Sequence, residues 1–228
     1  MEDKKTKRGS KTRRTGPHRD WSHKSVDFLT HTSPNQSAGL EEKESLGDRL
    51  RKARERRGLT LQELSSRTGT NLNNLKRMEA NEIIPPLGDL VKLGKALDTR
   101  MSYFISPGAD KPVTVVRADQ RRPVSRNIKT GSERYGYFYE SLAPEKANRK
   151  MEPFIVTLVP CDVVEPSTHD GQEFLLVLEG QMVAKIGDRT ESLGPGDAVY
   201  YDSSEPHYVR CAGESKAKIL AVIYPGSE

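Results

Sequence analysis

The chain has 228 residues, a formal net charge of +5 and only two cysteines. This length suffices for two small domains, each with its own hydrophobic core. No apolar run approaches the roughly 18 residues that a membrane-spanning helix needs, and residues 1–30 lack the continuous apolar segment of a secretory signal. We therefore expect a cytoplasmic protein without membrane contact, in which Cys161 and Cys211 remain unpaired and buried.

The charge is unevenly distributed along the chain. Residues 1–24 hold nine Lys or Arg against three acidic residues, and residues 46–105 hold twelve against seven. Residues 106–228 instead hold fifteen basic and eighteen acidic residues. Because clustered basic charge attracts phosphate groups, the pattern predicts that the N-terminal half approaches nucleic acid and the C-terminal half does not.

Residues 1–45 are rich in polar and basic residues and have no apolar period, which predicts a disordered basic tail. Two interpretations of its basic run remain open. The run adds non-specific phosphate contacts, or the segment is a solubilising tail or results from a misassigned start.

The segment 59–81 has the pattern of two short helices around a glycine turn. Thr60 and Glu63 are spaced as a capping box, which predicts a helix from Leu61. Gly69 is suited to the positive φ of a helix end, and Asn71 is suited to cap a second helix. On that second helix the apolar residues face inward and the polar residues face outward, which is typical of a helix-turn-helix.

Three further helices are predicted around this motif, over residues 46–57, 87–97 and 101–105. Gly58 ends the helix over 46–57, and a pair of prolines precedes the helix over 87–97. Together, residues 46–105 resemble the DNA-binding domain of the XRE family, the Cro and phage-repressor class, which is a five-helix bundle that binds operator DNA as a dimer. Glu79 is expected to pair with Arg49 or Arg54, since phosphate would repel a carboxylate at that position.

The resemblance implies which residues meet DNA. Leu72, Asn73 and Arg77 correspond to base-facing residues, where Asn suits adenine and Arg suits guanine. The full expected set is Thr60, Gln62, Asn71, Leu72, Asn73, Asn74, Lys76 and Arg77. Leu61 and Leu72 depart from the family pattern, because they offer no hydrogen bond to a base.

In the C-terminal half, apolar residues recur at every second position, which is the period of a β-strand. Short strands are predicted over 154–159, 173–180, 181–187, 198–202, 207–211 and 217–224, and a further strand carries Tyr135, Tyr137 and Tyr139. Many short strands separated by glycine turns are typical of a sandwich or barrel. The expected domains are a tail (1–45), a helix-turn-helix domain (46–105), a linker (106–121) and a β-domain (122–228).

Two motifs in this half resemble those of the cupin superfamily, a small jelly-roll barrel. His169 and Glu173 match the first motif and His207 matches the second, whereas Ser167 stands where metal-binding cupins have another histidine. The resemblance implies a divalent metal such as Fe, Zn, Mn or Ni. The alternative is a site that has lost its metal and only forms hydrogen bonds. Ser167 and the three tyrosines are expected to line a ligand pocket, although aromatic residues at period two also suit a packed core.

The fold class is thus a helical bundle followed by a cupin barrel, and three functions are compatible with it. The first is a homodimeric transcriptional regulator whose cupin domain senses a small molecule and modulates binding to double-stranded DNA. The second is a mononuclear non-haem iron enzyme of the hydroxypropylphosphonate epoxidase type. The third is a nucleoid-associated or antitoxin-like protein without an effector.

Overall fold

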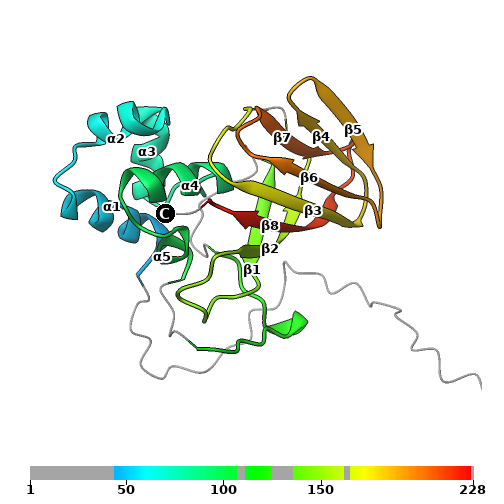
Figure 1. Cartoon of the computed structure of the whole chain (residues 1–228), viewed down its shortest axis with the longest axis horizontal. Coiled ribbons are helices and arrows are strands. Elements are labelled where there is room, and N and C mark those ends of the chain that lie inside the picture. Colours follow the sequence, from blue (N-terminus) through cyan, green and yellow to red (C-terminus); the bar gives the residue numbers. More distant parts are fainter. Residues whose placement is uncertain (1–43, 107–110, 125–135, 162–164, 227–228) are drawn as a thin grey trace, which may run out of the picture. The chain divides into compact units, whose positions relative to one another are not determined.

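The structure, a computed structural model, describes residues 44–106, 111–124, 136–161 and 165–226 (Figure 1). Tyr135 and most of the predicted tail lie outside these ranges. Residues 42–228 belong to one compact unit. Among the described residues, no helix combines the length and apolar character that crossing a membrane requires.

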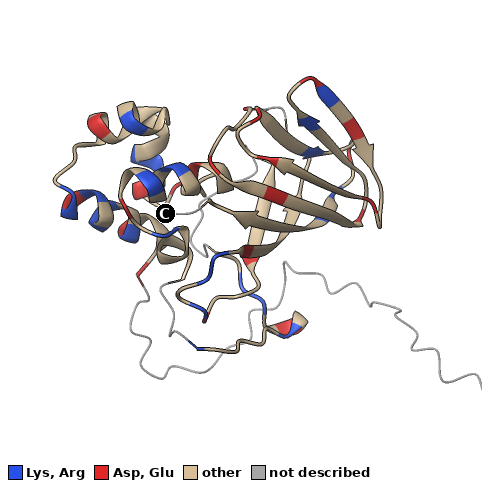
Figure 2. Cartoon of the chain, in the orientation of Figure 1, with Lys and Arg blue, Asp and Glu red and all other residues tan. Residues whose placement is uncertain are grey.

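Five α-helices form the N-terminal bundle between residues 44 and 106, and the first three begin at side-chain caps. They are α1 (Leu46–Arg56), α2 (Leu61–Thr68), α3 (Leu72–Glu79), α4 (Leu87–Ala96) and α5 (Met101–Ile105). The predicted capping box of Thr60 and Glu63 is present, and Gly69 ends α2 with φ of 71°. Lys and Arg are frequent on these helices and sparse on most strands (Figure 2).

The described residues after the bundle form eight strands, which pair in antiparallel fashion. They are β1 (Tyr137–Ser141), β2 (Glu152–Leu158), β3 (Gln172–Glu179), β4 (Met182–Ile186), β5 (Arg189–Leu193), β6 (Ala198–Asp202), β7 (His207–Cys211) and β8 (Ala217–Tyr224). One sheet has the order β1-β2-β8-β3-β6 and the other β5-β4-β7. This arrangement is consistent with the predicted jelly roll. In the predicted linker, Ala118–Gln120 forms a short 3₁₀ helix, η1.

Strand β5 was not predicted from the sequence. Its residues, RTESL, are mostly polar, and its backbone pairs only with β4 at the edge of the smaller sheet. An edge strand with little apolar content carries no hydrophobic period, so the local pattern does not distinguish it from a turn.

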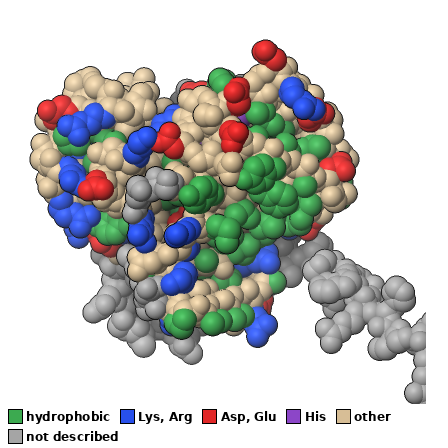
Figure 3. Space-filling model, viewed as in Figure 1, with side chains coloured by type: hydrophobic (Ala, Val, Ile, Leu, Met, Phe, Trp, Pro, Cys, Tyr) green, Lys and Arg blue, Asp and Glu red, His purple; other side chains and the backbone are tan. Residues whose placement is uncertain are grey.

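Alternating side chains on the larger sheet separate the barrel interior from its outer face. On β8, Ala217, Ile219, Ala221 and Ile223 are buried, whereas the residues between them are partly exposed. The outer face is itself apolar, and Figure 3 shows green side chains gathered over β3, β6 and β8. Tyr200 is the most exposed large side chain there, at 61%.

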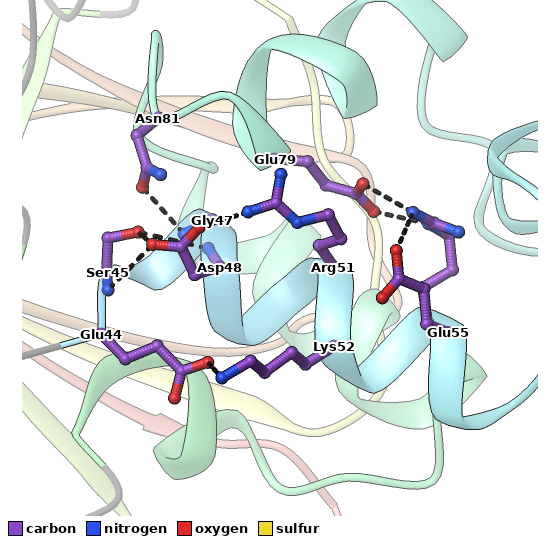
Figure 4. A network of polar contacts seen from close by, with 10 residues as sticks. Glu44, Ser45, Gly47, Asp48, Arg51, Lys52, Glu55, Glu79 and Asn81 are labelled. Carbon is purple, nitrogen blue, oxygen red and sulfur yellow. Dashed lines mark hydrogen bonds and ion pairs between the residues drawn. The ribbon is translucent and has the colours of Figure 1, made fainter.

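Polar contacts tie α1 to the turn that follows α3 (Figure 4). Ser45 and Asp48 form a second capping box, and the backbone N–H of Gly47 donates to Asn81 Oδ1 at 2.9 Å. Glu79 accepts from Arg54, with Nε–Oε1 and Nη2–Oε2 distances of 2.6 and 2.8 Å. Arg54 is therefore the partner of Glu79.

Arg49, the other predicted partner of Glu79, has a different role. This buried side chain donates from Nε to the Phe104 carbonyl at 2.8 Å and so links α1 to α5.

Buried hydrogen bonds from Arg149 hold together the loop between β1 and β2. Arg149 Nε lies 2.6 Å from Glu152 Oε2, and Arg149 Nη1 donates to the carbonyls of Ala143 and Lys146. The same loop accepts hydrogen bonds from Ser102 and Ser106, at Ala147 and Pro144. Burial raises the pKa of Glu152 to about 7, and Arg149 only partly opposes this effect.

This pKa predicts a pH dependence of stability. Between about pH 4.5 and pH 7, Glu152 keeps its proton in the folded protein, whereas the unfolded chain has released it. The contribution of Glu152 to the free energy of unfolding is therefore full below about pH 4.5 and is lost as the pH rises through 7. The loss amounts to at most about 3 kcal/mol. In urea unfolding, the free energy of unfolding of Glu152→Gln should fall less between pH 5 and pH 8 than that of the wild type. Glu214→Gln, at an exposed position, should keep the wild-type decline. Equal pH dependence in the wild type and Glu152→Gln would contradict the assignment.

Candidate metal centre and nucleic-acid interface

Three buried side chains from separate segments converge inside the barrel. Glu173 points inward from β3, in register with Tyr201 of β6 and Ile223 of β8. His207 is the first residue of β7 and pairs through its backbone with Ser167. His169 lies between Ser167 and β3, and its backbone N–H donates to the Ser203 carbonyl at 2.9 Å. Antiparallel pairing thus brings the two predicted motifs together.

The potential ligand atoms of His169, Glu173 and His207 all lie within 4.8 Å of one another. Glu173 Oε1 is 3.0 Å from His169 Nε2 and 3.8 Å from His207 Nε2. We call these three residues the candidate metal centre.

Backbone carbonyls set the orientation of both imidazoles. His169 Nδ1 is 2.9 Å from the Asp170 carbonyl, and His207 Nδ1 is 2.8 Å from the Glu205 carbonyl. Since a carbonyl only accepts, Nδ1 of each ring carries a proton, and Nε2 of each ring is directed toward Glu173. This second contact is typical of metal-ligating histidines.

The electrostatics of the centre favour an ionised carboxylate beside a neutral imidazole. Burial acts to raise the pKa of Glu173, but the hydrogen bonds from His169 and Tyr201 and the proximity of His207 outweigh it and lower that pKa. Burial lowers the pKa of His207, against the effect of Glu173. Burial and the neighbouring Glu173 raise the pKa of the Tyr201 hydroxyl, which therefore remains a donor to Glu173 Oε2.

These residues fit a divalent metal. Two lone-pair-bearing atoms 3.0 Å apart, His169 Nε2 and Glu173 Oε1, require a cation between them, either a proton or a metal ion. Two imidazoles and one carboxylate form the donor set of facial Fe(II) sites, and similar sets bind Zn(II). A bound metal would supply Lewis acidity and open coordination positions for a ligand.

Ser167 lies beside this donor set. Its Oγ is buried and has no hydrogen-bond partner within the described part of the chain. An unsatisfied buried hydroxyl is costly, so this position suits a ligand or a metal-bound water that supplies the missing contact.

Of the predicted tyrosines, Tyr137 and Tyr139 lie within the described residues, and neither contacts the candidate metal centre. Tyr139 is 1% exposed, packs edge-on against Phe154 and donates from its hydroxyl to the Pro85 carbonyl at 3.0 Å. It is thus a core residue. Tyr137 stacks on Tyr139 with ring centroids 6.3 Å apart. The aromatic residue that does reach the centre is Tyr201, which the sequence analysis did not single out.

The expected DNA-facing residues lie on α2 and α3. Gln62, Asn73 and Lys76 are exposed, and Leu72, Asn74 and Arg77 are partly buried. Arg77 Nε lies 3.5 Å from Glu82 Oε2. Two of the set are helix caps: Thr60 Oγ1 accepts from the Glu63 N–H at 3.1 Å, and Asn71 Oδ1 accepts from the Asn73 N–H at 2.8 Å.

Comparison with known protein families matches a domain in each half of the chain. Residues 45–100 match the family described as a helix-turn-helix domain, and residues 154–223 match the cupin domain family. The chain therefore carries a helix-turn-helix domain followed by a cupin domain.

Several proteins of known identity are similar to this chain over much of its length. The HTH-type transcriptional regulator SutR of Escherichia coli (strain K12) is 25% identical over 185 residues, covering 80% of this chain and 96% of SutR. The (S)-2-hydroxypropylphosphonic acid epoxidase of Streptomyces wedmorensis is 29% identical over 146 residues, covering 60% of this chain and 73% of the epoxidase. A crystal structure of an HTH_3 family transcriptional regulator from Vibrio cholerae has the same fold, with a TM-score of 0.54, 22% identity and coverage of 79% and 95%.

Metal titration tests the centre. In calorimetric titration with Co²⁺, Glu173→Gln should weaken binding by more than about 100-fold, because it removes the only anionic donor of the set. Tyr201→Phe should weaken binding by roughly 10-fold, because it removes only the hydrogen bond that orients that carboxylate. Wild-type affinity in Glu173→Gln would rule out this centre as the binding site.

Proposed function

We propose that this protein is a DNA-binding transcriptional regulator whose cupin domain senses a small molecule. The observation that carries the proposal is the union in one chain of a helix-turn-helix bundle with polar residues on α3 and a barrel holding a buried two-His, one-Glu centre. The similarity to SutR along nearly the whole of that regulator supports it.

On the DNA side, Asn73 and Arg77 would read base edges in the major groove, while Lys76 would bind phosphate. Leu72 would contact a thymine methyl group. Gln62, Asn74 and the two capping residues Thr60 and Asn71 would position the helices on the DNA backbone. Since one recognition helix reads a single half-site, the active form would be a homodimer.

On the sensor side, His169, Glu173 and His207 would hold a divalent metal, which would supply coordination positions for a small-molecule effector. The Ser167 hydroxyl beside them would be available to hydrogen-bond that effector. Binding would change operator affinity only if the effector distinguishes two conformations of the dimer.

A mononuclear iron oxidoreductase is the second candidate. The similarity to the Streptomyces epoxidase and the facial donor set favour it, since the same three ligands suit Fe(II) and oxygen chemistry. A nucleoid-associated or antitoxin-like protein is a third reading, in which no small molecule changes DNA binding.

DNA binding should depend steeply on salt. With a duplex from the region upstream of its own gene, fluorescence anisotropy should show an affinity loss of about 10³-fold or more between 50 and 200 mM salt, because counterions are released from phosphates. An affinity that stays constant over this range would contradict the proposal.

The side chains of α3 should contribute differently. Arg77→Ala should relax discrimination between the specific duplex and a scrambled one, whereas Lys76→Ala should weaken both alike. Arg189→Ala, an exposed position on β5, serves as the control and should change neither affinity. Equal losses on both duplexes for Arg77→Ala would remove its role in base reading.

Oxygen consumption by the Fe(II)-loaded protein distinguishes the regulator from the enzyme. For a regulator we expect that the Fe(II)-loaded protein consumes no oxygen with candidate ligands and still binds the duplex. Stoichiometric oxygen consumption without DNA binding would instead establish the enzyme.

A further inference from the structure

Helix α4 belongs to the helical bundle, yet its first turn touches the candidate metal centre. Gly88 is buried, and a Cβ placed on it would lie 2.2 Å from Ser167 Oγ and 2.7 Å from His169 Cδ2. No side chain fits in that space, so the backbone of α4 packs directly against a predicted metal ligand and the unsatisfied hydroxyl beside it.

Charged side chains on the same helix also act on the centre. Asp89 and Lys92 lie one turn apart, with Oδ1 and Nζ separated by 3.6 Å and side chains only 16% and 25% exposed. Asp89 lies close enough to His169, and Lys92 close enough to His207, for each pair to interact electrostatically. A cation bound at the centre therefore adds charge within the field of α4.

Polar contacts hold the two ends of α4 to the barrel. The Pro85 carbonyl, just before the helix, accepts from the Tyr139 hydroxyl, and Lys95 in the last turn pairs with the Asp170 carboxylate. Asp170 also accepts from the His169 ring through its backbone carbonyl. The residue that orients a metal ligand is thus bound to α4 as well.

On its other side α4 forms part of the bundle core. Leu90 and Leu93 are fully buried, and α4 packs against α2, which in turn packs against α3. Close-packed helices move as units, so a displacement of α4 is transmitted to the helices that face DNA.

We propose that α4 is a wall of the metal centre, positioned by Gly88 and Asp89, and that it couples occupation of this centre to the DNA affinity of the bundle. The coupling part rests on the proposed regulator function. Coupling of this kind changes affinity by about 5- to 150-fold, and the change is reciprocal: DNA alters metal affinity by the same factor.

The wall is tested without DNA, by Co²⁺ calorimetry. Gly88→Ala should weaken Co²⁺ binding at least about 10-fold, because its methyl group displaces α4 or the ligand His169. Gly47→Ala is the matched control: its Cβ would lie 2.3 Å from the Met78 carbonyl, a clash of similar severity inside the bundle, and it should leave Co²⁺ affinity within about twofold of the wild type. An equal loss of Co²⁺ affinity in both variants would indicate general destabilisation and would contradict the proposal that α4 forms a wall of the metal centre.

A second pair of variants avoids any steric clash. Asp89→Asn should weaken Co²⁺ binding several-fold, since it removes a carboxylate that interacts electrostatically with His169. Asp98→Asn, on an 85% exposed side chain at the end of α4, should have no effect. If Asp89→Asn and Gly88→Ala both bind Co²⁺ like the wild type, α4 is not part of the site.

The coupling is tested by anisotropy on the upstream duplex with and without Co²⁺. Wild-type DNA affinity should change by at least about fivefold, and Asp89→Asn should show a smaller change at saturating Co²⁺. Intact DNA binding with no response to Co²⁺ in the wild type would overturn the coupling. Complete absence of DNA binding would overturn the regulator function and the coupling with it, whereas the Co²⁺ results would still decide whether α4 forms the wall.

Discussion

A buried carboxylate between two imidazoles and a phenol is the interaction on which the barrel site depends. Placing the Glu173 charge inside the barrel is costly unless hydrogen-bond donors or a cation compensate it. Tyr201 and His169 contact different oxygens of this carboxylate, and backbone carbonyls orient both imidazoles. The surrounding strands therefore have to keep their register, because a shift by one residue would turn Glu173 away from the interior.

The helical bundle and the barrel share more than a linker. The hydroxyl of Tyr139, the ion pair of Lys95 with Asp170, and the loop contacts of Ser102 and Ser106 all join helices to the barrel. The buried apolar side chains of both parts also belong to a single cluster. Helix α4 has a special position among these contacts, since it packs into the bundle core on one side and against the metal ligand His169 on the other.

This architecture explains how a regulator and an enzyme can share one plan. A facial two-His, one-Glu set leaves coordination positions open, and these can receive an effector or a substrate with oxygen. The donor set does not distinguish the two uses. In this chain the basic bundle exposes Asn73 and Lys76 on α3, and such a surface suits contact with DNA.

The sequence alone determined the elements whose signals are local. Capping residues, turn glycines and the two apolar periods predicted the five helices and most strands, including the bounds of β6, β7 and β8. The cupin spacing also predicted that His169, Glu173 and His207 would meet. Only the tertiary structure decided what depends on packing between distant segments: that polar β5 pairs with β4, that Tyr201 rather than Tyr200 faces Glu173, that Tyr139 is a core residue, and that Gly88 touches His169. The reason is that periodicity and caps act within a few residues, whereas register and the approach of a helix to a barrel are set by the whole core.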